Sequence, residues 1–270
     1  MPESRTGRAE MAMMATSTWG LQIRTLPVRR ISVEAPNLWL IAAWRDFRRA
    51  PMISLGYGAL FVLAGYVIVF GLYNSGLASL VPAVIGGFFL VAPVLAVGLY
   101  DVSRRFELGE KVSFSQCMLA IRRNPGGLSS IGLILTLSLA AWLQIALLIF
   151  MLFFHEDTPS LDHFFYDVLT APDAAAFLVV GTAVGYVIAS IVFAISAISI
   201  PLLLDRDVPV LVAVATSIAA VRENWLVMLG WAATIVLLVG AGLACFFVGL
   251  AFTLPLVAYA TWHAYRSLLG

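Results

Sequence analysis

The sequence predicts an all-α fold: a polytopic transmembrane bundle of six helices, three hairpin-like units each preceded by a short interfacial amphipathic helix. Of the 270 residues, 61% are hydrophobic and only 11% are charged, against about 25% charged in an average soluble domain. A water-soluble core could not enclose that much apolar surface. In addition, all sixteen Lys and Arg residues fall into segments that one threading through a bilayer places on the same side.

This one-sided charge predicts the orientation. Loops rich in Lys and Arg stay in the cytoplasm during insertion, whereas Asp and Glu have little effect. We therefore expect a multi-pass protein of the bacterial inner (cytoplasmic) membrane with both termini cytoplasmic. The interfacial arginines of this arrangement are Arg48, Arg49, Arg104, Arg105, Arg122, Arg123, Arg222 and Arg266.

The chain divides into a tail and a membrane domain. Residues 1–33 hold five arginines and no apolar run long enough for a signal peptide, which predicts a disordered cytoplasmic tail. Residues 34–270 form the predicted six-span membrane domain.

The spans follow from apolar runs, because about 20 residues at 1.5 Å rise each cross ~30 Å of hydrocarbon. The residues between the third and fourth spans carry five acidic and no basic side chains, so they form the predicted external loop. The turn between the last two spans is predicted to be tight and external, and Gly240, Gly242 or Gly249 could make it. The predicted spans are about 53–72, 80–100, 128–154, 174–204, 226–246 and 249–268.

Three similar segments indicate duplication of a helical hairpin. The segments that open the odd-numbered spans read RRAP (48–51), RRNP (122–125) and RENW (222–225). The even-numbered spans each contain one late proline, which frees a backbone carbonyl and predicts a kink. These kink prolines are Pro93, Pro201 and Pro255. The clearest amphipathic segment precedes the third span, where apolar residues recur at helical spacing at Phe114, Cys117, Met118 and Ile121.

Few side chains in the spans suggest chemistry. Asp101 lies beside Tyr100 at the end of the second span, and intramembrane carboxylates often mark ion paths. With Arg104 one turn later, however, an i, i+3 pair that neutralises itself is the more common arrangement. Gln144 lies inside the third span and needs a hydrogen-bond partner there, more often from another helix than from a substrate.

Several functional classes lack support in the sequence. We find no phosphate-binding loop, zinc-protease motif or nucleophile elbow, so we expect neither enzymatic activity nor a cofactor. Acidic residues and His155 and His163 in the external loop could in principle bind a metal, but a polar external loop explains them better, and no metal site is predicted. With Lys111 as the only lysine, there is no clustered basic face for nucleic acid.

The run APVLAVGLYDVSRRFELGE (92–110), together with IRRNP (121–125), IPLLLDRD (200–207) and TWHAYR (261–266), resembles an uncharacterised bacterial family of predicted integral membrane proteins, a domain of unknown function. The resemblance covers about Pro36 to the C-terminus and implies the membrane class and topology but almost no activity. Some members are labelled as similar to cytochrome c oxidase subunit I. That catalytic role requires several embedded histidines, and this chain has only three in total.

These observations predict an integral inner-membrane protein of unknown biochemical activity, most simply a non-enzymatic accessory, scaffold or assembly subunit. Its expected partners are the lipid bilayer and other membrane protein subunits. The alternative is a small permease or lipid-handling transporter, whose cytoplasm-facing cavity lies near Tyr100, Asp101 and Gln144 and is lined by proline-kinked helices. A structure in which these side chains face lipid, or are sealed by packing with no cavity wide enough for water, would remove the basis for transport.

Overall fold

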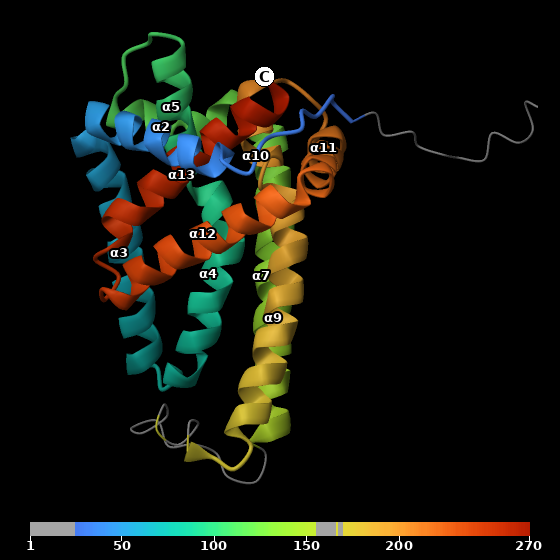
Figure 1. Cartoon of the computed structure of the whole chain (residues 1–270). Helices are drawn as coiled ribbons and strands as arrows, with labels where there is room; N and C mark the ends of the chain where they lie inside the picture. Colours follow the sequence, from blue (N-terminus) through green and yellow to red (C-terminus); the bar gives the residue numbers. More distant parts are fainter. Residues whose placement is uncertain (1–24, 155–165, 167–169) are drawn as a thin grey trace, which may run out of the picture.

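The computed structural model describes residues 25–154, 166 and 170–270, and all regular structure in these residues is helical (Figure 1). The helices are α2 (Ala35–Arg49), α3 (Pro51–Asn74), η1 (Ala78–Leu80), α4 (Val81–Leu95), α5 (Val97–Glu107), α6 (Phe114–Met118), η2 (Ala120–Arg123), α7 (Pro125–Phe153), α9 (Ala174–Ser196), α10 (Ser199–Asp205), α11 (Val210–Glu223), α12 (Trp225–Ala244) and α13 (Leu250–Leu269).

Five helices in the described part of the chain are long and apolar enough to cross a membrane. They are Pro51–Asn74, Val81–Glu107, Pro125–Phe153, Ala174–Asp205 and Trp225–Ala244. Their bounds lie within a few residues of the first five predicted spans, except that the second extends to Glu107. The all-helical fold is therefore confirmed. The predicted sixth span is helical as α13, but it is not among the five, so a count of six spans is not confirmed.

Helices α12 and α13 form a hairpin whose turn includes Gly249, one of the three glycines that the sequence offered for it. The turn lies at Cys245–Gly249, and Gly240 and Gly242 belong to α12. The hydroxyl of Tyr66 donates to the carbonyl of Phe246, with an O–O distance of 2.6 Å. Because Tyr66 lies eight residues before the end of α3, the turn is about 12 Å short of that end. The turn therefore lies beside the middle of α3 and does not reach the level where α3 ends (Figure 1).

This turn is stabilised by a neighbouring helix. Phe246 and Phe247 have φ angles of 51° and 65°, in a left-handed region that non-glycine residues seldom adopt. Phe246 is also 81% exposed. In hydrocarbon, where no water is present, an unpaired carbonyl costs roughly several kcal/mol. The Tyr66 hydroxyl therefore gives the Phe246 carbonyl a hydrogen bond that lipid could not supply.

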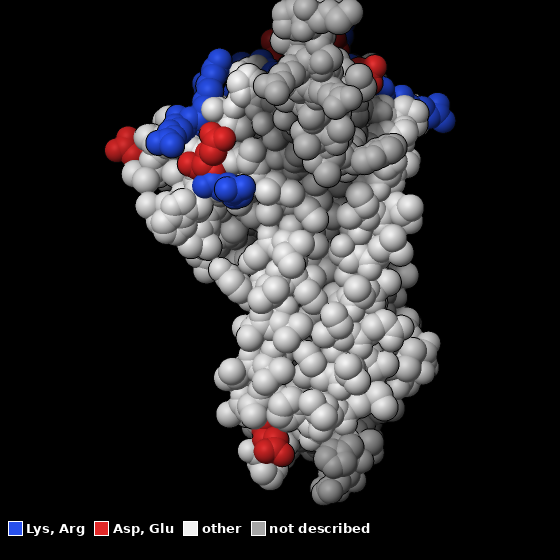
Figure 2. Space-filling view, turned by 90° about the vertical axis from the view of Figure 1, so that its right-hand side faces the viewer, with Lys and Arg blue, Asp and Glu red and all other residues white. Residues whose placement is uncertain are grey.

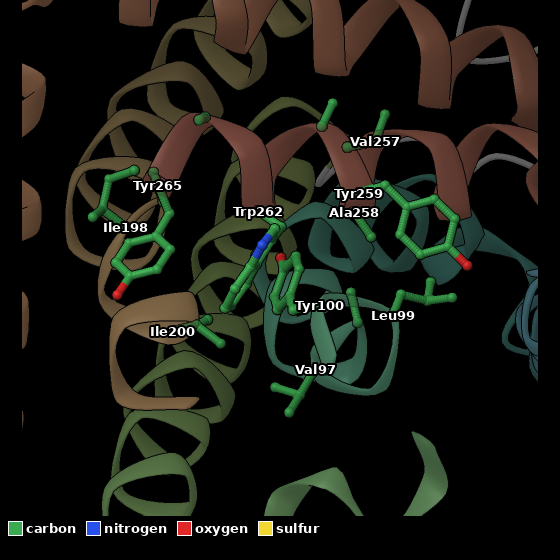
Figure 3. Packing of buried hydrophobic residues seen from close by; sticks show 14 of the residues in the cluster. Val97, Leu99, Tyr100, Ile198, Ile200, Val257, Ala258, Tyr259, Trp262 and Tyr265 are labelled. Carbon is green, nitrogen blue, oxygen red and sulfur yellow. The ribbon is translucent and has the colours of Figure 1, made fainter. Parts of the chain in front are cut away.

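Helix α13 forms the centre of the core. It packs against α2, α3, α5 and α12, and it buries 13 of its 20 residues. Trp262, at 1% exposure, lies between Tyr100 of α5 and Ile200 of α10 (Figure 3). The core is therefore concentrated around α13, near the end of the molecule that holds the C-terminus (Figure 1).

Part of the predicted disordered tail is ordered. Residues 25–32 have no regular secondary structure and lie against α11 and α13. The backbone N–H of Arg29 donates to the carbonyl of Leu268 at 2.9 Å, and the Asn224 side chain bonds both the N–H of Ile31 and the carbonyl of Arg29. Both described ends of the chain thus lie on the same side of the bundle. Residues 1–24 lie outside the described residues.

Short helices precede three long ones, at the places where interfacial helices were predicted. They are α2 before α3, α6 with η2 before α7, and α11 before α12. The N-terminus of α6 is capped, since Ser113 Oγ accepts from the N–H of Gln116 at 3.4 Å. Their placement at a membrane interface stays a prediction.

The three prolines differ in their effect. Pro93 lies three residues before α4 gives way to α5 at Ala96, and Pro201 lies in α10, just after α9 ends at Ser196. Pro255 is accommodated inside an uninterrupted α13. Two of the three predicted kink prolines therefore lie near an actual break in a helix.

Candidate functional site

Charged side chains gather at one end of the molecule, which we call the basic end. Figure 2 shows Lys and Arg together with acidic groups at this end, above a long surface free of charge in that view, with an acidic side chain near the opposite end. The ends of α2, α5, α10 and α13 meet there (Figure 1). The chain supplies this end from four separate segments, so the site is a product of tertiary structure.

Asp101 is the most deeply buried acid of this cluster, at 0% exposure. Arg105 Nε lies 2.6 Å from Asp101 Oδ2, and Arg104 Nη1 lies 3.5 Å from Oδ1. Arg104 Nε is also 3.3 Å from Asp205 Oδ1, which links α5 to α10. The structure therefore agrees with the self-neutralising pair and adds a second arginine.

Helix α13 is joined to the same cluster by its polar side chains. Trp262 Nε1 donates to Glu107 Oε1 at 3.0 Å, and Arg266 Nε lies 3.0 Å from Glu107 Oε2. The Tyr265 hydroxyl donates to Asp205 Oδ2 at 2.7 Å. Because buried polar groups are costly unless they are paired, these contacts fix how α13 sits on α5 and α10.

A third group of contacts surrounds Asp46 of α2, which is 5% exposed. The Ser103 hydroxyl donates to Asp46 Oδ2 at 2.7 Å, and His263 Nε2 lies 2.8 Å from the same oxygen. In a hydrolase the imidazole must accept the proton of the serine hydroxyl, whereas here Ser103 bonds to the carboxylate. This geometry positions α2, α5 and α13 and does not activate a nucleophile.

The structure contains two cavities near these helices. A polar cavity of about 140 Å³ opens at the basic end, and its lining is Ala42, Arg45, Asp46, Arg49, Ser103, Phe106, Glu107 and His263. An apolar cavity of about 80 Å³ lies deeper, between α4, α5, α9, α12 and α13. Pro93, Tyr100 and Thr261 are among its lining residues.

The structure does not bring the three predicted cavity residues together. Tyr100 is buried and lines the apolar cavity, while Asp101 is enclosed in ion pairs. Gln144 is exposed on α7, outside both cavities. The predicted interfacial arginines also divide: Arg104, Arg105 and Arg266 are ion-paired, whereas those exposed on the surface are Arg48, Arg49, Arg122, Arg123 and Arg222.

Sequence reasoning missed the contacts around Asp46, including the one with His263. These two residues are 217 positions apart, and no local spacing links them. Ser103 lies two residues after Asp101 and Glu107 two residues after Arg105, but their partners Asp46 and Trp262 are 57 and 155 positions away in the chain.

The two cysteines differ in environment. Cys117 is 1% exposed, and its thiol donates to the Ser113 carbonyl at 3.1 Å. Burial raises the pKa of the Cys117 thiol to about 11, so the thiol stays neutral near pH 7. Cys245 is exposed in the α12–α13 turn. Both are free thiols.

Metal ligands do not cluster among the described residues: no group of three or more His, Cys, Asp or Glu side chains there could hold a metal ion. The acidic loop with His155 and His163 lies outside the described residues, so no contact of theirs bears on this point.

Comparison with known proteins gives one match. Residues 80–205 match the model of a family described as "Predicted integral membrane protein (DUF2189)". The matched region begins at the end of η1, runs through α10 and includes the motif at 92–110, so the resemblance is confirmed for this region. No curated protein and no solved structure matches the chain. With five helices of membrane-spanning length, the chain is a multi-pass integral membrane protein whose residues 80–205 match this family of unknown function.

Proposed function

We propose that the protein is a non-enzymatic accessory or scaffold subunit that docks onto another membrane protein through the lipid-facing side of α7. The observation that carries this proposal is Gln144. Its side chain is exposed, and no described residue gives it a hydrogen bond. It lies nine residues before the end of α7, with apolar residues on both sides.

An amide in this position favours a protein neighbour. In hydrocarbon, a side-chain amide gains roughly 1–2 kcal/mol when it bonds across to another helix. Two hydroxyls in the middle of the same helix do not share this need, because Thr136 and Ser138 donate to the carbonyls of Gly132 and Ile134. Gln144 is thus an exposed amide of α7 that a partner helix would satisfy.

The surroundings of Gln144 fit a docking role. The α7–α9 pair extends beyond the α3–α4 turn (Figure 1), and large apolar side chains such as Leu148 and Leu152 are more than 60% exposed there. On the inner side of α7, the Trp142 indole donates to the carbonyl of Ala83 at 2.7 Å and fixes α7 against α4. One face of α7 is therefore anchored within the bundle, and the other carries the amide outward.

The test uses a photo-crosslinking amino acid at position 144 in native membranes, with the same group at Tyr186, an exposed position on α9, as the control. We expect one defined membrane polypeptide to crosslink at 144 and not at 186. The variant Gln144→Leu should reduce its co-purification in mild detergent at least fivefold, whereas Thr136→Val should not. Crosslinks to lipid alone, or only to a second copy of this chain, would contradict an accessory role.

The apolar cavity favours a second candidate, a lipid-handling function. Its lining is almost wholly apolar and includes Pro93 and Tyr100, two residues that the alternative prediction named. The volume of this cavity is about 80 Å³, which roughly three water molecules occupy in liquid water. A small apolar cavity of this kind suits a short piece of an acyl chain better than a polar solute. Native mass spectrometry of the wild type and of Ala258→Phe, which fills the cavity, tests it: an unchanged number of retained lipids would rule this function out.

A further inference from the structure

We propose that the polar cavity at the basic end binds one phosphate group, supplied by the phosphodiester of a phospholipid head group, with Arg45 and Arg49 as its main ligands. Both arginines line this cavity of about 140 Å³. Roughly four or five water molecules occupy the same volume in liquid water, and a phosphate group fits into it. The site is independent of docking through α7.

The charged groups of this cavity that have no described ion-pair partner are both cationic. Asp46 accepts from Ser103 and contacts His263, and Glu107 accepts from Trp262 and pairs with Arg266. The acids of the lining thus have protein partners. In contrast, neither Arg45 nor Arg49 forms an ion pair with a described residue. An anion is the ligand that this arrangement accepts.

Arg45 and Arg49 are placed so that both can contact one ligand in the cavity. They lie four residues apart and therefore on one face of α2. The guanidinium of Arg49 lies over the Phe106 ring, 5.6 Å from its centroid, which restrains the side chain through a cation–π contact. Guanidinium groups bind phosphate oxygens in pairs of parallel hydrogen bonds, so two arginines on one face, of which Arg49 is restrained, suit phosphate in particular.

Helix α2 itself is fixed in the fold. Trp39 of α2 packs edge-on against Trp231 with ring centroids 5.5 Å apart, and its indole donates to Ser267 of α13 at 2.8 Å. The arginines therefore project from a rigid element, which reduces the entropy lost when a ligand is bound.

The position of the cavity indicates a lipid as the source of the phosphate. Arg49 is separated by one residue from Pro51, where the membrane-length helix α3 begins. Trp44, on the same turn of α2 as Arg45, is 42% exposed, and exposed tryptophans favour the level of the lipid head groups. A cavity at the end of a spanning helix meets head-group phosphates at high local concentration.

The experiment titrates the full-length protein in non-ionic detergent with three probes and follows binding by calorimetry. The probes are dihexanoyl-phosphatidylglycerol, dihexanoylglycerol without phosphate, and inorganic phosphate. We expect saturable one-to-one binding of the phosphatidylglycerol and at least tenfold weaker binding of dihexanoylglycerol. Inorganic phosphate should bind measurably but more weakly than the lipid; if it binds equally well, the phosphate chemistry holds and the ligand is a free phosphate.

The matched variants are Arg45→Gln/Arg49→Gln and, as a control with the same loss of charge, Arg48→Gln/Arg122→Gln, whose arginines are exposed outside the cavity. The first pair should weaken phosphatidylglycerol binding at least tenfold, and the control less than twofold. Equal loss in both pairs would show general attraction to basic residues and overturn the proposal. Equal binding of the phosphate-free lipid by the wild type would overturn it as well, without dependence on any variant.

Discussion

Helices α13 and α7 differ in a way that hydropathy does not reveal. Helix α13 contains Arg266, His263 and three threonine or serine residues, yet it buries 13 of its 20 residues. Helix α7 is among the most apolar in the chain, yet it buries five of 29. In a membrane protein, lipid accepts apolar surface as readily as a protein core does, so strong hydropathy reports contact with lipid and not burial in protein.

The comparison shows which part of the molecule depends on contacts between particular side chains. The basic end is held by buried polar contacts with defined partners, and the outer part of α7–α9 is held mainly by apolar and aromatic packing, such as the edge-on rings of Phe154 and Phe177, 5.2 Å apart. Polar contacts are directional, whereas apolar packing in lipid can be rearranged at lower cost. The arrangement around α13 should therefore respond more strongly to substitution than the lipid-facing surfaces.

The largest contrast should appear within α7 itself. Leu135 is fully buried and Leu137 is 60% exposed. We expect Leu135→Ala to destabilise the protein by about 2–5 kcal/mol because it leaves a cavity, and Leu137→Ala to change the stability by less than about 0.5 kcal/mol. Thermal unfolding in detergent measures both. Equal effects would show that α7 does not face the bundle with Leu135.

The buried ion pairs give the next contrast. Asp101→Asn removes the carboxylate that both Arg104 and Arg105 contact, and we expect a loss of about 1.5–3 kcal/mol. The two arginines keep other partners, Asp205 and Glu110, which limits the effect. The control Asp173→Asn lies at the opposite end and is exposed; a comparable loss there in the same denaturation assay would refute the special role of the basic end.

Close backbone approach between α3 and α13 predicts a smaller effect. A Cβ atom at Gly58 would clash with the Ala251 carbonyl oxygen, so Gly58→Ala must push the helices apart. We expect it to cost about 1–3 kcal/mol. Gly71, on the outer part of the same helix, has nothing within 4 Å of such an atom, and Gly71→Ala should stabilise slightly, by up to about 1 kcal/mol. A neutral Gly58→Ala in thermal unfolding would mean that the contact is loose.

The smallest effect concerns the cysteines and changes reactivity, not stability. Burial raises the pKa of Cys117 to about 11, and only the thiolate reacts. In detergent at pH 8, N-ethylmaleimide should modify exposed Cys245 well before Cys117. The Cys117 rate should rise as the pH approaches 11, because the protonated, unreactive form persists below the raised pKa. Peptide mass mapping follows both sites, and equal rates at pH 8 would show that the basic end is open around Cys117.

The first five long helices were predictable because each depends on a local apolar run. The α12–α13 turn was predictable in its sequence position, since it includes Gly249 between two apolar runs. Its geometry was not, because Phe246 and Phe247 are in left-handed conformations and Tyr66 of α3 bonds to the Phe246 carbonyl. The contact between Asp46 and His263 was also invisible, because it joins residues 217 positions apart.

The sequence by itself determined the class of protein, the positions of the long helices and the concentration of basic residues in a few segments, because the exclusion of charge from hydrocarbon acts on each segment locally. Only the tertiary structure decided that α13 is the centre of the core and that its hairpin turns beside the middle of α3. It also decided that Arg45 and Arg49 border a polar cavity while Gln144 faces outward. These features depend on which surfaces meet, and in lipid the meeting of surfaces is governed by shape and polar pairing that hydropathy does not record.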